Sequence, residues 1–223
     1  MNLSVIIPYC KGDSLRDRGL HRLGWCIQDQ LWDNCEKVRF ELLVSDDVVT
    51  NGLPWNKSSC INRGVKKAQY NNLLILDADI RFGTDYFQKV IEFAKDKEFF
   101  MGYNQVRYDR GLDNMHQRVM EIKDVTACAL SFFINKDLFW DVGGGNEKYY
   151  GHGNEDNDLY ARIKHRLGFE GIAPHLPYEI EHTYHHWHRP DSSYPLNKDR
   201  VKLFEETKKD IEGEIQRLKE RRI

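Results

Sequence analysis

The sequence predicts an α/β fold with a doubly wound, mostly parallel sheet. Three short apolar runs, Leu3–Ile7, Phe40–Ser45 and Leu73–Leu76, predict strands, the third of them buried. Two segments with amphipathic spacing separate them, from Ser14 to about Asp33 and from Asn56 to Gln69. Because strands that alternate with helices form parallel units, the first eighty residues predict the order β-α-β-α-β.

The rest of the chain adds further strands and helices around this half. It predicts a helix over Tyr86–Ala94, one or two strands over Glu98–Arg107, a strand over Thr126–Ile134, a helical turn over Asp137–Asp141, a helix over Asn154–Arg166 and a strand within Ile172–His182. Two loops stand out, the polar and ambiguous Gly111–Asp124 and the glycine-rich Gly143–Gly153. Both are candidates for a mobile lid over a site.

The domain boundaries follow from these elements. Residues 1–192 form the main domain, and residues 193–223 form a charged C-terminal helix that is an appendage of it. Phe204, Ile211 and Leu218 recur every seven residues in this helix. The stripe favours packing on its own domain, with a dimer seam or a membrane-surface contact as the alternatives.

Composition excludes several classes of function. The net charge of −2 argues against nucleic acid, and no apolar run reaches the length of a membrane span. The N-terminus lacks the pattern of a signal peptide, and the five scattered cysteines are typical of free thiols in a reducing compartment. We therefore expect a cytoplasmic protein, with a peripheral membrane location as the alternative.

Two carboxylates, Asp77 and Asp79, follow the third strand. Ligands of open α/β sheets bind at the carboxyl ends of the strands, and strand alternation would point both side chains to one side. Like charges so close repel each other unless a cation lies between them, which favours a divalent ion that also holds a diphosphate. The alternative is an ordinary strand end followed by a capping aspartate.

A second acidic cluster, Asn154–Asp158, opens a helix behind the glycine-rich loop. Acids at a helix start are favoured by the helix dipole and cap free N–H groups, which is the structural explanation. Three acids in four positions behind five glycines also suit a general base beside a sugar hydroxyl. We expect the dipole to keep Asp156 ionised at neutral pH.

The third cluster is the histidine-rich run His182–Pro190. His185 and His188 could turn toward one ion, whereas a surface histidine run is the alternative. Mixed carboxylate and imidazole ligands favour Mn²⁺ over Ca²⁺ or Mg²⁺, and a zinc site is the competing interpretation.

Taken together, the motifs resemble a GT-A fold glycosyltransferase, near glycosyltransferase family 2 and the β-1,4-galactosyltransferase and chondroitin-polymerase type. The resemblance covers most of residues 3–190. It rests on the strand ending at Pro8, Ser45-Asp46-Asp47, Trp55-Asn-Lys57 with Ile61-Asn62-Arg63-Gly64, Asp77-Ala-Asp79, the signature Val142–Leu159 and His185-His-Trp-His188.

The resemblance implies a role for each matching residue. Asp79, His185 and His188 would bind Mn²⁺, with Mg²⁺ as the alternative. Asp156 would deprotonate the acceptor, and Glu155 would bind it, with Glu155 as the alternative catalytic base. The donor site would comprise Pro8, Tyr9, Asp46 or Asp47 at uracil, Lys57 near the diphosphate, Asn62, Asp77 at the ribose or the ion, Gly151, His152 and Gly153. His152 stands where galactosyltransferases carry a tryptophan, which leaves the sugar and the acceptor open.

These implications predict a metal-dependent, inverting transfer from a UDP-sugar to a hydroxyl of a glycan, polysaccharide or other glycoconjugate. One rival is a sugar-phosphate nucleotidyltransferase, which shares the sheet and the paired acids. Another is a sugar-nucleotide or glycan binding module of the same fold that has lost turnover.

Overall fold

The structure is a computed structural model of the 223-residue chain. It describes residues 1–10, 14–32, 38–46, 55–103, 105–109, 118–121, 128, 131–151, 153–171, 173–176, 183–186 and 199–221. At 14–16, 31–32, 105–109, 118–121 and 183–186 only the backbone is described.

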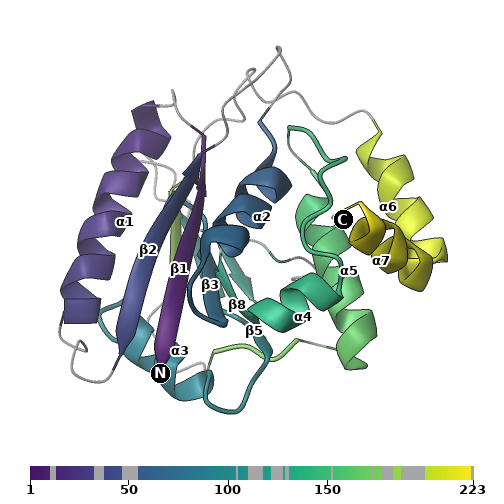
Figure 1. The fold of residues 1–223 in the computed structure, drawn as a ribbon. Coiled ribbons are helices and arrows are strands. Elements are labelled where there is room, and N and C mark those ends of the chain that lie inside the picture. Colours follow the sequence, from purple (N-terminus) through teal and green to yellow (C-terminus); the bar gives the residue numbers. More distant parts are fainter. Residues whose placement is uncertain are drawn as a thin grey trace.

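A five-stranded mixed sheet forms the centre of the molecule (Figure 1). Its strand order is β2-β1-β3-β8-β5, with the pairs β1–β2 and β1–β3 parallel and β3–β8 and β5–β8 antiparallel. The strands are β1 (Asn2–Tyr9), β2 (Arg39–Asp46), β3 (Asn72–Leu76), β5 (Phe99–Met101) and β8 (Ser131–Asn135). The predicted doubly wound α/β class is therefore confirmed, and the sheet is mixed.

Helices pack around this sheet and bury its aliphatic strands. The helix α2 packs on β1 and β2, α1 packs against α3, and α4 packs on β8 (Figure 1). The helices are α1 (Ser14–Trp32), α2 (Lys57–Lys67), α3 (Tyr86–Phe93), α4 (Lys136–Asp141), α5 (Glu155–Leu167), α6 (Arg200–Lys209) and α7 (Ile211–Glu220). Each helix predicted before residue 170 is present, with boundaries within a few residues of those expected.

A second, four-stranded sheet brings distant segments together. Its order is β4-β9-β6-β7, with β4 at Ile80–Arg81, β6 at Gln105–Asp109, β7 at Arg118–Glu121 and β9 at Thr183–His186. The sequence indicated no strand at β4 and a loop at β7, because both strands are short and depend on pairing with other segments of the chain. The rest of the Gly111–Asp124 loop lies outside the described residues.

Two strand predictions need correction. Of the strand expected over Thr126–Ile134, the described residues 131–134 lie in β8, and Cys128 is not in a strand. Of the strand expected within Ile172–His182, the described residues 173–176 form only a single bridge between His175 and Met101. The next strand, β9, begins one residue beyond the predicted segment.

The C-terminal segment contains two helices instead of the single one expected. The helix is interrupted at Asp210, which lies between α6 and α7. Its side chain accepts a hydrogen bond from the Gly213 N–H and so caps α7. Ile215 and Leu218 are buried, and an added Cβ on Gly143 would lie 2.8 Å from Leu218 Cβ. This face of α7 therefore packs on its own domain, while the boundary at residue 192 and a dimer through this segment stay predictions.

None of the helices in the described part of the chain is long and apolar enough to span a bilayer.

Candidate active site

The centre of the candidate site is the buried ammonium group of Lys57. Its Nζ lies 2.9 Å from a carboxylate oxygen of Asp77 and 3.1 Å from one of Asp156. Asp77 follows β3 and Asp156 lies in the first turn of α5, so one cation joins two segments that are remote in sequence. The structure thus brings together three residues that the sequence had assigned to the diphosphate, the ribose and the acceptor.

The start of α2 fixes the position of Lys57. Asn56 caps the helix by accepting a hydrogen bond from the Ser59 N–H at 2.9 Å, and its amide donates to the Glu147 carbonyl at 2.8 Å. Lys57 is therefore the first residue of a capped helix, a position where the backbone is well ordered. Asn56 was expected at the start of this helix but was not identified as its cap, although an asparagine directly before a helix is a recognisable cap signal.

The electrostatics of the three groups depend on their burial. Burial lowers the pKa of Lys57, but the carboxylates of Asp156, Asp77 and Glu155 more than offset it and hold this pKa well above its usual value. Burial raises the pKa of Asp156 to about 8; the Lys57 ammonium lowers it, and the charges of Glu155 and Asp77 add to the rise. The expectation that the helix dipole keeps Asp156 ionised at neutral pH is therefore wrong, because burial and two like charges outweigh the dipole.

Asp77 and Asp79 lie in the turn beyond β3, because the strand ends at Leu76. Strand alternation is thus not the reason for their orientation. The helix α1 approaches this turn closely at Gly19, where an added Cβ would lie 2.8 Å from the Ala78 carbonyl oxygen. The glycine lets the helix rest on the turn, which fixes the backbone between the two acids.

The predicted metal ligands are only partly covered by the described residues. Asp79 is buried, and β4 pairs with β9 so that Ile80 lies opposite His185. Because Asp79 directly precedes Ile80, the backbone of His185 lies within one residue of the position opposite Asp79. The His185 side chain and all of His188 lie outside the described residues, and the side chains that are described contain no group of three metal-binding residues.

The glycine-rich loop is held against α2 by hydrogen bonds. The Asn62 amide donates to the Gly145 carbonyl at 2.9 Å and to the Glu147 carboxylate at 2.7 Å, while its oxygen accepts from the Gly145 N–H at 2.8 Å. The Gly151 N–H donates to the Trp55 carbonyl at 2.8 Å. Asn62, predicted to bind the donor, therefore clamps the loop, and its contact with a donor stays a prediction.

Two of the glycines before α5 adopt backbone conformations that favour this residue type. Gly151 and Gly153 have φ values of 68° and 125°, and the Gly153 N–H donates to the Glu155 carboxylate at 2.9 Å. His152, between them, lies outside the described residues. Glu155 thus stabilises the end of the loop, directly beside Asp156.

A fully buried ion pair holds α5 in place behind the site. Arg162 bonds Asp158 through two nitrogens, at 3.0 and 2.6 Å, and donates to the Gly144 carbonyl at 2.7 Å. Asp158 also accepts hydrogen bonds from Thr207 at 2.8 Å and Tyr149 at 3.4 Å. The last acid of the cluster therefore anchors the loop, α5 and α6, and no pattern in the sequence pointed to Arg162 as its partner.

The nucleotide end of the predicted site is formed by β1 and β2. Pro8 and Tyr9 lie beside Ser45 and Asp46 in the parallel register. The Tyr9 hydroxyl bonds Asp17 of α1, and the Arg63 guanidinium donates to the Asp46 carbonyl. The exposed Asp46 carboxylate can accept from a nucleobase, whereas Asp47 lies outside the described residues.

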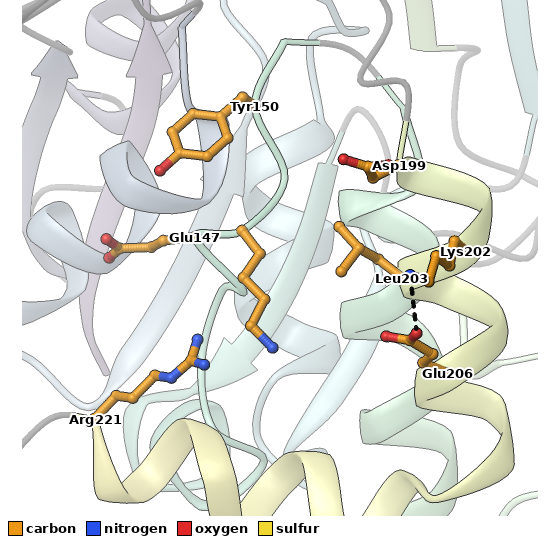
Figure 2. A pocket seen from close by; sticks show the side chains of 8 residues that line it. Glu147, Tyr150, Asp199, Lys202, Leu203, Glu206 and Arg221 are labelled. Carbon is orange, nitrogen blue, oxygen red and sulfur yellow. Dashed lines mark ion pairs between the residues drawn. The ribbon is translucent and has the colours of Figure 1, made fainter.

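A separate cavity of about 660 Å³ lies beside the glycine-rich loop (Figure 2). Glu147 and Tyr150 of the loop, Leu203 of α6 and Arg221 after α7 surround it in Figure 2. None of its lining residues is a predicted site residue. The cavity therefore does not locate the donor, which has to be argued from the Lys57 cluster.

The comparisons with known proteins agree with this architecture. Residues 94–188 match the model of a family described as "Glycosyltransferase like family 2". No protein with a curated record matches the sequence.

Solved structures of glycosyltransferases share the fold. The catalytic domain of Drosophila β1,4-galactosyltransferase 7 in complex with xylobiose is 15% identical, with a TM-score of 0.63 over 92% of this chain and 79% of that one. A mutant of the same enzyme in complex with manganese, UDP-Gal and xylobiose has a TM-score of 0.66 and 15% identity, covering 91% and 79%. S. aureus TarS 1–349 in complex with UDP-GlcNAc has a TM-score of 0.52 and 14% identity, covering 91% and 64%.

The chain thus has the GT-A fold that these glycosyltransferases share, as the motifs predicted. More particularly, it is family 2-like over residues 94–188 and similar in fold to a β-1,4-galactosyltransferase.

Proposed function

We propose that this protein transfers a sugar from a UDP-sugar to a hydroxyl acceptor, with the aid of a divalent metal ion and with inversion at the anomeric carbon. The observation that carries the proposal is the contact of the Lys57 ammonium with both Asp77 and Asp156. Asp77 belongs to the D-x-D turn, where a donor diphosphate is expected, and Asp156 to the helix start expected to face the acceptor. One buried cation therefore sets the spacing between the donor side and the acceptor side.

A uridine nucleotide fits the ends of β1 and β2. Asp46 is exposed there beside Tyr9, and a carboxylate can accept the N–H of uracil. Solved structures of the same fold contain UDP-Gal and UDP-GlcNAc, which supports a UDP-sugar as the donor here.

The residues beside the D-x-D turn fit a divalent metal ion. Asp79 offers a buried carboxylate, and the β4–β9 register brings the His185 backbone beside it. Carboxylate with imidazole suits Mn²⁺, which is present in one structure of the same fold. We infer that Asp79, His185 and His188 would hold the ion, which when bound would neutralise the charge of the departing diphosphate.

Asp156 acts as the general base in this proposal. Its carboxylate takes the proton of the acceptor hydroxyl as that oxygen forms a bond to the anomeric carbon. The bond from the anomeric carbon to the phosphate oxygen breaks, and UDP leaves with the electron pair. Because the pKa of Asp156 is raised to about 8, the group is a strong enough base to remove such a proton once it is ionised.

The test is a panel of UDP- and GDP-sugars with Mn²⁺ and sugar acceptors, including xylosides, read out as nucleotide release and product mass. Asp156→Asn should keep donor binding, measured by thermal stabilisation with UDP, and lose about 10²- to 10⁴-fold in turnover. In the native enzyme kcat/KM should fall about tenfold per pH unit below pH 8, because the base must be ionised.

Three outcomes separate the proposal from its rivals. An NMR assignment of the product should show a β linkage from an α-linked UDP-sugar, and a retained α linkage would contradict inversion. Release of diphosphate from a nucleoside triphosphate would indicate a nucleotidyltransferase. Binding of UDP without any turnover would indicate a binding module.

A further inference from the structure

The strand β2 forms one edge of the five-stranded sheet. Among the described residues only β1 pairs with it, in an unbroken register from Arg39 opposite Asn2 to Asp46 opposite Tyr9. One side of an eight-residue strand therefore presents backbone N–H and C=O groups outward. Such an edge is a template for pairing with another strand.

This edge carries little of the protection that monomeric proteins use. Edge strands are commonly kept apart by lysine, proline or a bulge, and the eight residues of β2 contain none of these. Glu41, the charged residue nearest the middle, is partly buried and accepts hydrogen bonds from the Ser4 hydroxyl and the Gln69 N–H. Every second residue of β2 lies on the same face of the sheet, and on one face these residues are Phe40, Leu42 and Val44, which are all exposed.

The apolar face of β2 continues onto α1. Trp25 of α1 is 75% exposed, and together with Leu20, Phe40 and Leu42 it lines a groove of about 600 Å³ between the helix and the strand. Figure 1 shows α1 and β2 side by side at the margin of the molecule. Contiguous exposed apolar surface of this kind, rimmed by polar residues, marks an interaction site on a soluble protein.

We propose that the occupant of this surface is a second copy of the same chain, joined by antiparallel pairing of β2 with β2 about a two-fold axis. In antiparallel pairs, opposite residues lie on the same face of the sheet. An axis through Leu42 places Leu42 opposite Leu42 of the second copy and Phe40 opposite Val44. All three exposed apolar side chains then meet apolar partners, and the two sheets join into one.

The pattern of β2 favours a second copy over other occupants. A closed two-fold dimer needs one self-complementary patch, and the alternation Phe-x-Leu-x-Val is self-complementary about its central residue. A lipid surface would require lysine or arginine around the apolar face. The residues that line the groove carry none of these, and their polar members are His21 and Gln28. The dimer is independent of the transfer reaction, so either proposal can fail alone.

The test is the mass in solution, by light scattering and sedimentation at micromolar concentrations. The native chain should be dimeric. Leu42→Lys and Leu42→Asp should each be monomeric, because like charges would lie opposite each other at the axis. Leu42 is already 40% exposed, so both variants should fold, which circular dichroism checks. Val201→Lys, at an exposed apolar residue of α6, is the matched control and should stay dimeric.

Mixing the two Leu42 variants tests the register directly. Lysine on one copy would face aspartate on the other, so the mixture should form a heterodimer with at least tenfold tighter association than either variant alone. If these variants fail to fold, Trp25→Glu provides the same test from α1 and should also weaken the dimer. A monomeric native chain would overturn the proposal, as would dimerisation that is unaffected by Leu42 or Trp25 substitutions. Binding of the native monomer to neutral lipid vesicles would instead assign the patch to a membrane.

Discussion

Replacing Lys57 with methionine tests whether a single ammonium holds the two carboxylates together. Lys57 is 6% exposed, and the side chains of Asp77 and Asp156 are 21% and 20% exposed. Methionine keeps an unbranched side chain of similar length and removes the charge. Removal of one partner from a buried ion pair costs about 3–5 kcal/mol. Because both carboxylates retain some contact with water, we expect the lower end, about 3 kcal/mol, at pH 8, where Asp156 is ionised to a substantial extent.

The loss should depend on pH, with a defined sign. Without the ammonium the two carboxylates repel each other, so their pKa values rise and the folded variant holds more protons than the unfolded chain. Its free energy of unfolding therefore decreases as pH rises, by about 1.4 kcal/mol per pH unit for each extra proton held. In the native chain the Lys57 ammonium causes no pH dependence of the free energy of unfolding in this range. Its pKa is raised by folding, so its stabilising effect is fully present below about pH 10.5. The deficit of the variant should widen from pH 6 to pH 8.

Urea unfolding at pH 6, 7 and 8, followed by tryptophan fluorescence, measures this deficit. Lys148→Met is the matched control, because Lys148 is 34% exposed and its partner Glu214 keeps an ion pair with Arg217. The control should lose less than about 1 kcal/mol with no trend. Adding Asp156→Asn to Lys57→Met should recover most of the pH-dependent part. A loss below about 1 kcal/mol at pH 8, or a loss that is flat with pH, would refute the bridging role of Lys57.

Three further predictions concern the donor, the metal and the loop. UDP should bind more tightly than GDP in the presence of Mn²⁺, because Asp46 or Asp47 accepts the uracil N–H; calorimetric titration measures this, and equal affinities would remove the base assignment. Asp79→Ala should abolish Mn²⁺-dependent transfer, as a chelator should reversibly in the native enzyme, and full activity under either condition would exclude the metal site. Arg162→Met should destabilise the fold by about 3–5 kcal/mol in urea unfolding. Arg162→Lys should recover little of this, because lysine cannot bond Asp158 and the Gly144 carbonyl in the same planar geometry; full recovery would show that only the charge matters.

The parts of the fold that the sequence predicted well are those fixed by local patterns. The strands β1, β2 and β3 are short aliphatic runs, and β1 and β3 are buried along nearly their whole length, which produces a clear local signal. The strand β2 has the same kind of pattern, although most of its residues are exposed. The acids after β3 and at the start of α5 were located for the same reason, since they follow or precede an element with a clear period. The roles proposed for these acids could be predicted because they depend on where each acid lies relative to the end of a strand or the start of a helix.

The parts that escaped prediction depend on long-range contacts. The two-residue strand β4 exists only because it pairs with β9, about a hundred residues later, and no local pattern reveals such a pair. The contact between Lys57 and Asp156 spans 99 residues. The ionisation of Asp156 was predicted wrongly for the same reason, because the helix dipole is visible in the sequence and the burial and the neighbouring carboxylates are not.

These long-range contacts converge on one helix. Within its first two turns α2 contributes Asn56, which caps the helix and holds the Glu147 carbonyl, Lys57, which joins Asp77 to Asp156, and Asn62, which clamps Gly145. The helix is in turn fixed to the sheet at Gly64, where an added Cβ would lie 2.5 Å from Ile6 of β1. A rigid element therefore supports both sides of the proposed reaction, because a shift of α2 would move the donor-side acid, the base and the loop together. A site built this way should tolerate variation in the exposed acceptor surface far better than variation at the start of α2, since only the latter changes the distance across which a sugar would pass.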